Sequence, residues 1–161
     1  MPDFDYTGRY AYHLVTVTID REPLLVDETA RDVASALGES SAATKFELLA
    51  YVIMPDHVHV LALGAADDAN VIRFMQRFKQ VTGFRYKRRC AGALWQHSFY
   101  DRALRRDEDL VSAAGYILGN PIRAGLMMVD EVWSHQGGSL LAGTEAALSE
   151  GCDCEHADRR S

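Results

Sequence analysis

The feature that most constrains the fold is a pair of apolar stretches separated by only two residues. Residues 45–54 form a nearly continuous apolar run, Pro55 and Asp56 supply a turn, and residues 57–63 continue as a second apolar run. Strands joined by so short a turn pair with each other as an antiparallel hairpin. We therefore expect an antiparallel sheet built around this hairpin, with the first of its two strands in the central position.

Further strands and helices flank the hairpin and are indicated by their hydrophobic period and by the residues that bound them. The expected strands are residues 11–19 and 94–104, and the expected helices are residues 27–37, 68–88 and 107–120. Gly38 is expected to stop the first helix, and Gly83 to bend or shorten the second. The order contains βαββαβ, the ferredoxin-like split unit, so we predict an α+β fold with helices packed on an antiparallel sheet. A fold this common identifies no function.

Length and composition favour one globular domain. The chain has 161 residues, of which 48% are hydrophobic, and we expect a domain over residues 1–145 and a flexible polar tail over residues 146–161. No run approaches the roughly 18 apolar residues of a membrane span, and the first residues do not read as a secretory signal, so a cytoplasmic protein without a membrane partner is expected. Cys152, Cys154 and His156 form either a partial metal site or part of that tail.

The charge is distributed unevenly along the chain. Residues 67–106 hold ten basic and three acidic residues, a net charge of +7, whereas the rest carries −13 in a chain of net charge −6. Such a segment predicts a local anionic partner, and single-stranded DNA is the candidate. The residues expected to bind it are Arg73, Arg77, Lys79, Arg85, Lys87, Arg88, Arg89 and Arg102. Interleaved aromatic residues would either stack on unpaired bases or belong to the core; they are Phe84, Tyr86, Trp95, Phe99 and Tyr100.

Two histidines lie at alternate positions at the start of the second hairpin strand. Because side chains on a strand alternate between its two faces, His57 and His59 project to the same side, roughly 6 to 7 Å apart. Two imidazole nitrogens so placed can bind one cation. The alternative is a pair of ordinary histidines at the beginning of a strand, each hydrogen-bonded or exposed.

A tyrosine and an asparagine at helical spacing offer the remaining chemistry. Tyr116 and Asn120 are four residues apart, so one helical face presents both a phenol and an amide oxygen. A phenol attacks a phosphodiester when a divalent cation polarises it, and the set of donors is compatible with Mg²⁺ or Mn²⁺ and does not exclude zinc. The alternative readings are a packing tyrosine and an asparagine that ends a helix before Pro121.

Three stretches together resemble a known family. They are M-P-D-H-V-H-V-L, L-W-Q-H-S-F-Y-D and Y-I-L-G-N-P-I-R-A-G-L, and the resemblance spans residues 10–135. In this order and spacing they are similar to the IS200/IS605-like single-tyrosine transposases of the HUH class, and most closely to the REP-associated tyrosine transposase branch.

The resemblance implies a function and a role for each site residue. His57 and His59 would be metal ligands, Asn120 would complete the metal site, and Tyr116 would be the nucleophile that attaches to the 5′ phosphate of single-stranded DNA. The substrates would be imperfect, REP-like hairpins, and the protein would act as a monomer or a homodimer. Asp56 departs from the family, in which Asn is frequent at this position, and could serve as an outer partner of the metal site.

The leading hypothesis is therefore a metal-dependent single-stranded DNA endonuclease and strand transferase, working through a covalent 5′-phosphotyrosine. A second hypothesis is a domesticated protein that binds DNA hairpins without cutting them. A third is a hydrolase of small phosphoesters, for which the basic segment would be unnecessary.

Overall fold

The structure is a computed structural model that describes residues 5–105, 109–128 and 130–141. Within these residues a five-stranded antiparallel sheet has the order β4-β1-β3-β2-β5. The strands are β1 (Ala11–Val17), β2 (Phe46–Ile53), β3 (His57–Gly64), β4 (Tyr100–Ala103) and β5 (Gln136–Gly137). The predicted hairpin is confirmed as β2 and β3. The middle strand, however, is β3, because β2 has only the two-residue β5 on its other side.

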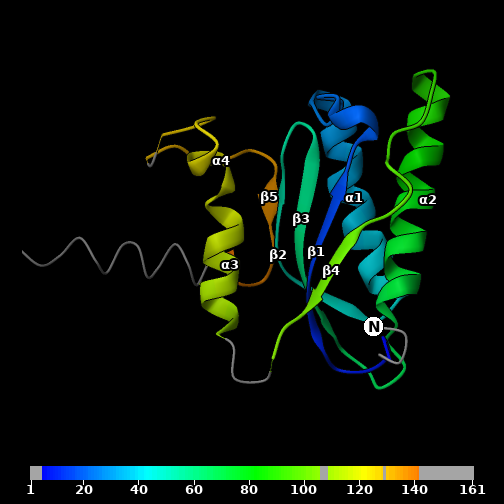
Figure 1. The fold of residues 1–161 in the computed structure, drawn as a ribbon, viewed down its shortest axis with the longest axis vertical. Helices are drawn as coiled ribbons and strands as arrows, with labels where there is room; N and C mark the ends of the chain where they lie inside the picture. The colour runs from blue at the N-terminus through cyan, green and yellow to red at the C-terminus, as the bar shows by residue number, and fades with distance from the viewer. Residues whose placement is uncertain (1–4, 106–108, 129, 142–161) are drawn as a thin grey trace, which may run out of the picture.

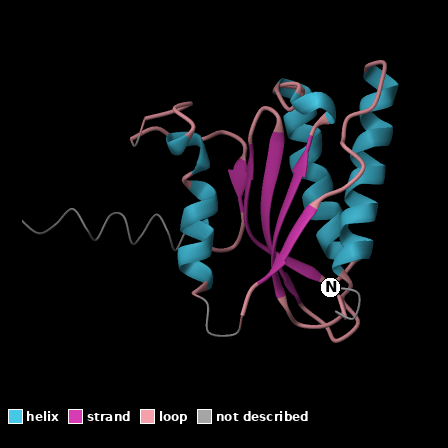
Figure 2. Cartoon of the chain, in the orientation of Figure 1, coloured by secondary structure: helices cyan, strands magenta, loops and turns pink. Residues whose placement is uncertain are grey.

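Helices cover both faces of the sheet (Figures 1 and 2). On one face lie α1 (Asp27–Ala43) and α2 (Val71–Arg89), and on the other lie α3 (Leu110–Leu118) and the short α4 (Asn120–Arg123). A 3₁₀ turn, η1 (Ile19–Arg21), follows β1. The order β1-α1-β2-β3-α2-β4 is the predicted ferredoxin-like unit, so the predicted α+β fold class is confirmed. β5 was not anticipated from the sequence.

Alternation along the strands divides the buried side chains between two cores. The larger core lies between the sheet and α1 with α2, and its bulkiest members include Tyr12, Leu14, Leu37, Ile53, Phe74 and Phe78. The smaller core lies between the sheet and α3, and includes Val52, Leu61, Ala114, Ile117 and Leu118. Strand residues that alternate with the larger core therefore point toward α3. This alternation determines which polar residues reach the α3 face.

The predicted stop of the first helix at Gly38 is wrong, because α1 continues to Ala43. Leu37, Ser40 and Ser41 are buried on the helix face that packs on the sheet. Glycine costs a helix interior only about 1 kcal/mol relative to alanine, so packing on this face outweighs it.

The second long helix also continues past Gly83, where the sequence predicted a bend or an early end. α2 runs through Gly83 to Arg89, with Thr82 and Tyr86 buried on either side of the glycine. It begins three residues later than predicted, where the side chain of Asn70 accepts a hydrogen bond of 3.1 Å from the backbone N–H of Arg73. This cap satisfies one of the helix's free amide groups and sets its start.

The predicted strand over residues 94–104 is only partly formed. Tyr100–Ala103 pairs with β1, while Trp95 makes an isolated bridge to Thr18, just beyond the end of β1. Between them, the carbonyl oxygens of residues 96–98 accept hydrogen bonds from the Lys79 ammonium group. A side chain thus takes the place of a neighbouring strand for these backbone groups.

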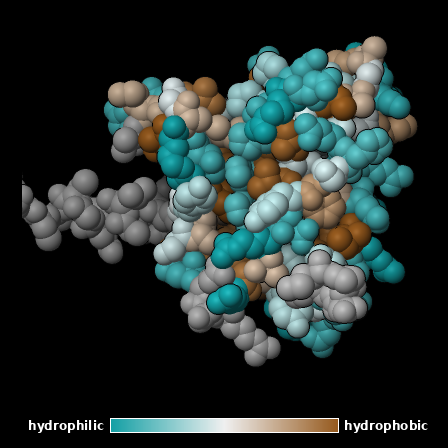
Figure 3. Space-filling model, in the orientation of Figure 1, coloured by the Kyte–Doolittle hydropathy of each residue, from teal (hydrophilic) through white to brown (hydrophobic). Residues whose placement is uncertain are grey.

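Hydrophilic side chains predominate on the face of the molecule shown in Figure 3, and the hydrophobic ones form small, separate patches. Across the described ranges, no helix combines the length and apolar character needed to cross a bilayer. The predicted domain boundary at residue 145, the predicted tail and its Cys152, Cys154 and His156 lie outside the described residues.

Candidate active site

The two histidines of β3 lie on the sheet face that α3 covers. Val58 and Val60 are fully buried in the larger core, so the alternating His57 and His59 project toward α3. The centroids of the two imidazole rings are 4.9 Å apart, and the rings meet edge to face. The predicted projection of both rings to one side is confirmed.

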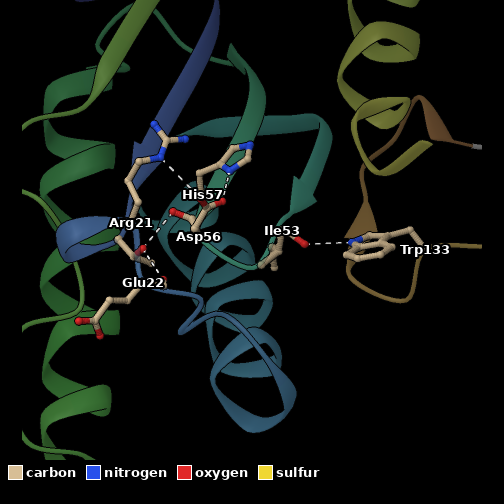
Figure 4. Close-up of polar contacts among 7 residues, drawn as sticks. Arg21, Glu22, Ile53, Asp56, His57 and Trp133 are labelled. Carbon is tan, nitrogen blue, oxygen red and sulfur yellow. Dashed lines mark hydrogen bonds and ion pairs between the residues drawn. The ribbon is translucent and has the colours of Figure 1, made fainter. Parts of the chain in front are cut away.

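Asp56 orients His57 from the turn before β3. Its carboxylate lies 2.6 Å from Nδ1 of His57 and 3.5 Å from Nε of Arg21, as Figure 4 shows. Partial burial raises the pKa of Asp56, but the hydrogen bond and charge of His57, together with Arg21, outweigh burial and lower it. Nδ1 of His57 is thereby engaged by a carboxylate, which leaves Nε2 for a cation, as in carboxylate–histidine–metal arrangements.

His59 has a different partner, His13, which was not predicted from the sequence. Its Nδ1 lies 2.9 Å from Nε2 of His13 on β1, and the two rings stack with centroids 5.2 Å apart. Burial, and then the charges of His57, His13 and Arg123, lower the pKa of His59 to about 3. His59 is therefore neutral near pH 7 and keeps a lone pair for a cation.

The position of His13 on a strand was predictable from the sequence, but its contact with His59 was not. His13 stands inside the first predicted strand, on the face that alternates with the buried Tyr12 and Leu14. In the β1–β3 register His59 pairs with Val15, so His13 is its diagonal neighbour. Only the register between two strands more than forty residues apart brings these rings together.

Tyr116 lies in the last turn of α3 and is exposed, although the next residue, Ile117, is buried. Ile117 is 1% exposed and packs on the sheet, whereas Tyr116 is 61% exposed. The guanidinium carbon of Arg123 lies 4.0 Å from the centroid of the tyrosine ring, and Arg123 also donates a hydrogen bond to the Tyr116 carbonyl oxygen. A side chain at Gly119 would meet the Arg123 guanidinium at 2.7 Å, so glycine leaves room for this contact.

A cavity of about 350 Å³ is lined by both Tyr116 and His13, the histidine that contacts His59. It opens between α3 and strands β1 and β4, and both Tyr116 and His13 line it. Arg102 of β4 lines the same cavity, and its charge contributes to lowering the pKa of His13 after burial. The phenol of Tyr116, the imidazole of His13 and the guanidinium group of Arg102 therefore line the same cavity.

Asn120 is the first residue of α4, and Gly119 is the single residue between it and the end of α3 at Leu118. The backbone of Gly119 is itself helical, so the two short helices follow each other closely. The Asn120 amide nitrogen donates to the carbonyl oxygen of Ile117 at 2.7 Å. This contact orients the carboxamide, and its oxygen is the group suited to a cation.

The metal donors predicted from the sequence are nitrogen and oxygen atoms. In residues 5–105, 109–128 and 130–141, no three His, Cys, Asp or Glu side chains are grouped to hold a metal ion. The donors predicted from the sequence are the imidazoles of His57 and His59 and the amide oxygen of Asn120, and their meeting at one ion stays a prediction. Neutral imidazole and amide oxygen fit Mn²⁺, with Mg²⁺ and Zn²⁺ also compatible.

The basic residues grouped in the sequence are divided by the fold. Those on α2 lie across the sheet from the histidines, and two of them pair with α1: Arg85 with Glu39 at 2.8 Å and Arg89 with Asp32. The α2 members of the predicted set are Arg73, Arg77, Lys79, Arg85, Lys87, Arg88 and Arg89. Only Arg102, of the residues predicted to bind DNA, lines the cavity with Tyr116.

The aromatic residues of the basic segment are divided in the same way. Tyr86 and Trp95 are buried in the larger core, and Phe99 packs against it. Phe84 and Tyr100 are 64% and 57% exposed. The core interpretation therefore holds for three of the five, and two remain available to stack on a base.

Residues 6–117 match the family model described as transposase IS200 like, which includes His57, His59 and Tyr116 and ends before Asn120. Over 143 residues the chain is 29% identical to a protein of Haemophilus influenzae assigned as a REP-associated tyrosine transposase, covering 81% of each chain.

Two solved structures share the fold. One is a REP-associated tyrosine transposase bound to a REP hairpin, with a TM-score of 0.68 and 20% identity over 98% of this chain and 91% of that one. The other is a transposase from Deinococcus radiodurans, with a TM-score of 0.54 and 22% identity over 78% of this chain and 97% of that one. The family match covers more than two thirds of the sequence, and the chain therefore belongs to the IS200-like transposase family.

Proposed function

We propose that this protein is a metal-dependent endonuclease and strand transferase of single-stranded DNA, with Tyr116 as its nucleophile. The observation that carries the proposal is the shared cavity, in which Tyr116 and His13 face one space while His13 contacts His59. A nucleophile and a cation site must meet at the same phosphate, and here elements distant in sequence supply both.

In the proposed reaction, the phenol oxygen of Tyr116 attacks the phosphorus of a DNA phosphodiester. A bond forms between that oxygen and phosphorus, and the bond from phosphorus to the 3′ oxygen breaks. The phenol proton passes to solvent, and the leaving 3′ oxygen takes up a proton to become a hydroxyl group. Attack by another 3′ hydroxyl on the phosphotyrosine reverses these steps and joins a new strand.

The surrounding residues would hold and orient the phosphate. A bound Mn²⁺ or Mg²⁺ would stabilise negative charge on its non-bridging oxygens, and His57, His59 and Asn120 would bind that ion. Arg102 lines the cavity, and Arg123 lies over the Tyr116 ring, which supports the proposal that both guanidinium groups would pair with phosphate oxygens. The DNA partner proposed is a REP-like hairpin, which is supported by the structural neighbour solved with such a hairpin.

The test is formation of a covalent protein–DNA adduct. The purified protein, incubated with a labelled hairpin oligonucleotide and MnCl₂, should give a labelled band that survives denaturing electrophoresis. Tyr116→Phe should abolish this band, because the nucleophilic oxygen is lost while the ring remains. Tyr100→Phe is the matched control, since it removes the hydroxyl of another exposed tyrosine but keeps the ring that could stack on a base, and it should leave the band intact.

Two results would contradict the proposal in different ways. An adduct that persists in Tyr116→Phe would assign the nucleophile elsewhere. Metal-independent hairpin binding by the unmodified protein, with no adduct under any divalent cation, would instead support a binding protein that does not cut.

A further inference from the structure

The two candidate metal ligands of β3 differ in what supports them. His57 is oriented by the Asp56 carboxylate at 2.6 Å, whereas Nδ1 of His59 faces Nε2 of His13 at 2.9 Å. A metal-binding imidazole ordinarily donates its other ring N–H to a partner that fixes the ring and its tautomer. His59 has such a partner only if His13 takes this role.

The contact between the two rings joins Nδ1 of His59 and Nε2 of His13 at hydrogen-bonding distance, so one of the two nitrogens donates and the other accepts. The surroundings of both rings favour their neutral forms. Burial, followed by the Arg102 charge, lowers the pKa of His13, and the pKa of His59 is lowered to about 3. A neutral imidazole has one N–H and one lone pair, so a hydrogen bond between two such rings has one donor and one acceptor. Which ring donates determines which nitrogen of His59 carries the lone pair.

We propose that His13 is a positioning residue for His59: Nε2 of His13 accepts a hydrogen bond from Nδ1–H of His59, and Nε2 of His59 is thereby left unprotonated for the cation. In the opposite arrangement His59 would carry its proton on Nε2 and could not bind a metal there. The inference depends on the proposed function only in taking His59 as a ligand.

The placement of His13 makes it suited to this role. β1 and β3 are neighbouring strands paired over seven residue positions, so the backbones that carry the two rings are held in register by the sheet. The rings are stacked with an interplanar angle of 27°, which restricts rotation of His59. His13 also lines the cavity with Tyr116, so loss of the His13–His59 contact would change the cavity in which DNA is expected to bind.

The first test reads the tautomer directly in the metal-free protein. Two-bond ¹H–¹⁵N correlation spectra of the histidine rings, assigned with a His59→Gln variant, should show His59 protonated on Nδ1 and unprotonated on Nε2. A spectrum with His59 protonated on Nε2 overturns the proposal.

The second test measures the affinity for Mn²⁺ alone by calorimetry, in two variants of position 13. His13→Gln keeps an oxygen acceptor near the position of Nε2 and should bind Mn²⁺ within a few-fold of the unmodified protein. His13→Phe keeps a ring without an acceptor and should bind roughly 10- to 100-fold more weakly, the usual cost of losing such a partner. Thermal unfolding of both variants checks that each is folded.

Equal Mn²⁺ affinity in His13→Phe and the unmodified protein overturns the proposal, as does equal weakening in both variants. Neither test involves DNA or cleavage, so failure here leaves the Tyr116 adduct experiment unaffected. Conversely, absence of an adduct alongside the expected tautomer and Mn²⁺ affinities would contradict the proposed function alone.

Discussion

The two faces of the sheet use their polar side chains in opposite ways. On the α1 and α2 face, charged groups stay at the rim and pair with one another, as Arg85 does with Glu39, above a core of large apolar side chains. On the α3 face, His13, His57 and His59 are half-buried, and His13 lines a cavity together with Tyr116. The comparison teaches that the face with the larger apolar core is expected to contribute more to stability, while the face with the smaller core also holds polar groups.

The largest effect is expected from truncating the core of the α2 face. Phe74 is fully buried and stacks on Phe46 with ring centroids 5.3 Å apart. Phe74→Ala should lower the free energy of unfolding by about 3–5 kcal/mol, because a cavity replaces the ring. Chemical denaturation measures this loss, and Tyr116→Phe, an exposed change on the other face, should stay within about 0.5 kcal/mol. Comparable losses of unfolding free energy in the two variants would contradict the larger contribution to stability expected from the α1 and α2 face.

A smaller effect on stability is expected from lowering the pH, through His59 on the α3 face. Burial and neighbouring charges lower the pKa of His59 from 6.5 to about 3. An unfolded chain binds a proton at His59 as pH falls below 6.5, while the folded chain does not until pH 3, so stability should fall with pH across this window.

Urea unfolding between pH 7.5 and 4.5, in a chelating buffer, tests this dependence. The decline should be shallower in His59→Gln than in the unmodified protein. His97→Gln, which alters an exposed histidine, is the control and should follow the unmodified protein. If His59→Gln loses stability as steeply as the unmodified protein, the neutral state assigned to the half-buried His59 is wrong.

The smallest effect is expected on DNA binding, when an arginine on one face of the sheet is replaced and compared with an arginine on the other. Arg102 lines the cavity with Tyr116, whereas Arg77 is exposed on α2, across the sheet. Arg102→Ala should weaken hairpin binding and reduce the slope of log affinity against log salt by about 1, the loss of one phosphate contact. Arg77→Ala should change the slope less. Equal changes in a fluorescence-anisotropy titration would mean that DNA contacts both faces, and would restore the predicted role of α2.

Patterns with a fixed local period were predictable. The β2–β3 hairpin follows from Pro55 and Asp56 between two apolar runs, and the common projection of His57 and His59 follows from strand alternation. Local stop signals were less reliable: Gly38 does not end α1, because side chains on either side of it are buried against the sheet. Tertiary packing overrides a penalty of about 1 kcal/mol.

By itself, the sequence determined the βαββαβ order, the paired imidazoles and the motif that holds Tyr116, since each depends on residues near one another in the chain. Only the tertiary structure decided that His13 meets His59 and that the α2 arginines lie on the far side from both. Strand register and the choice of sheet face depend on pairing between distant segments, and no local period encodes either of them.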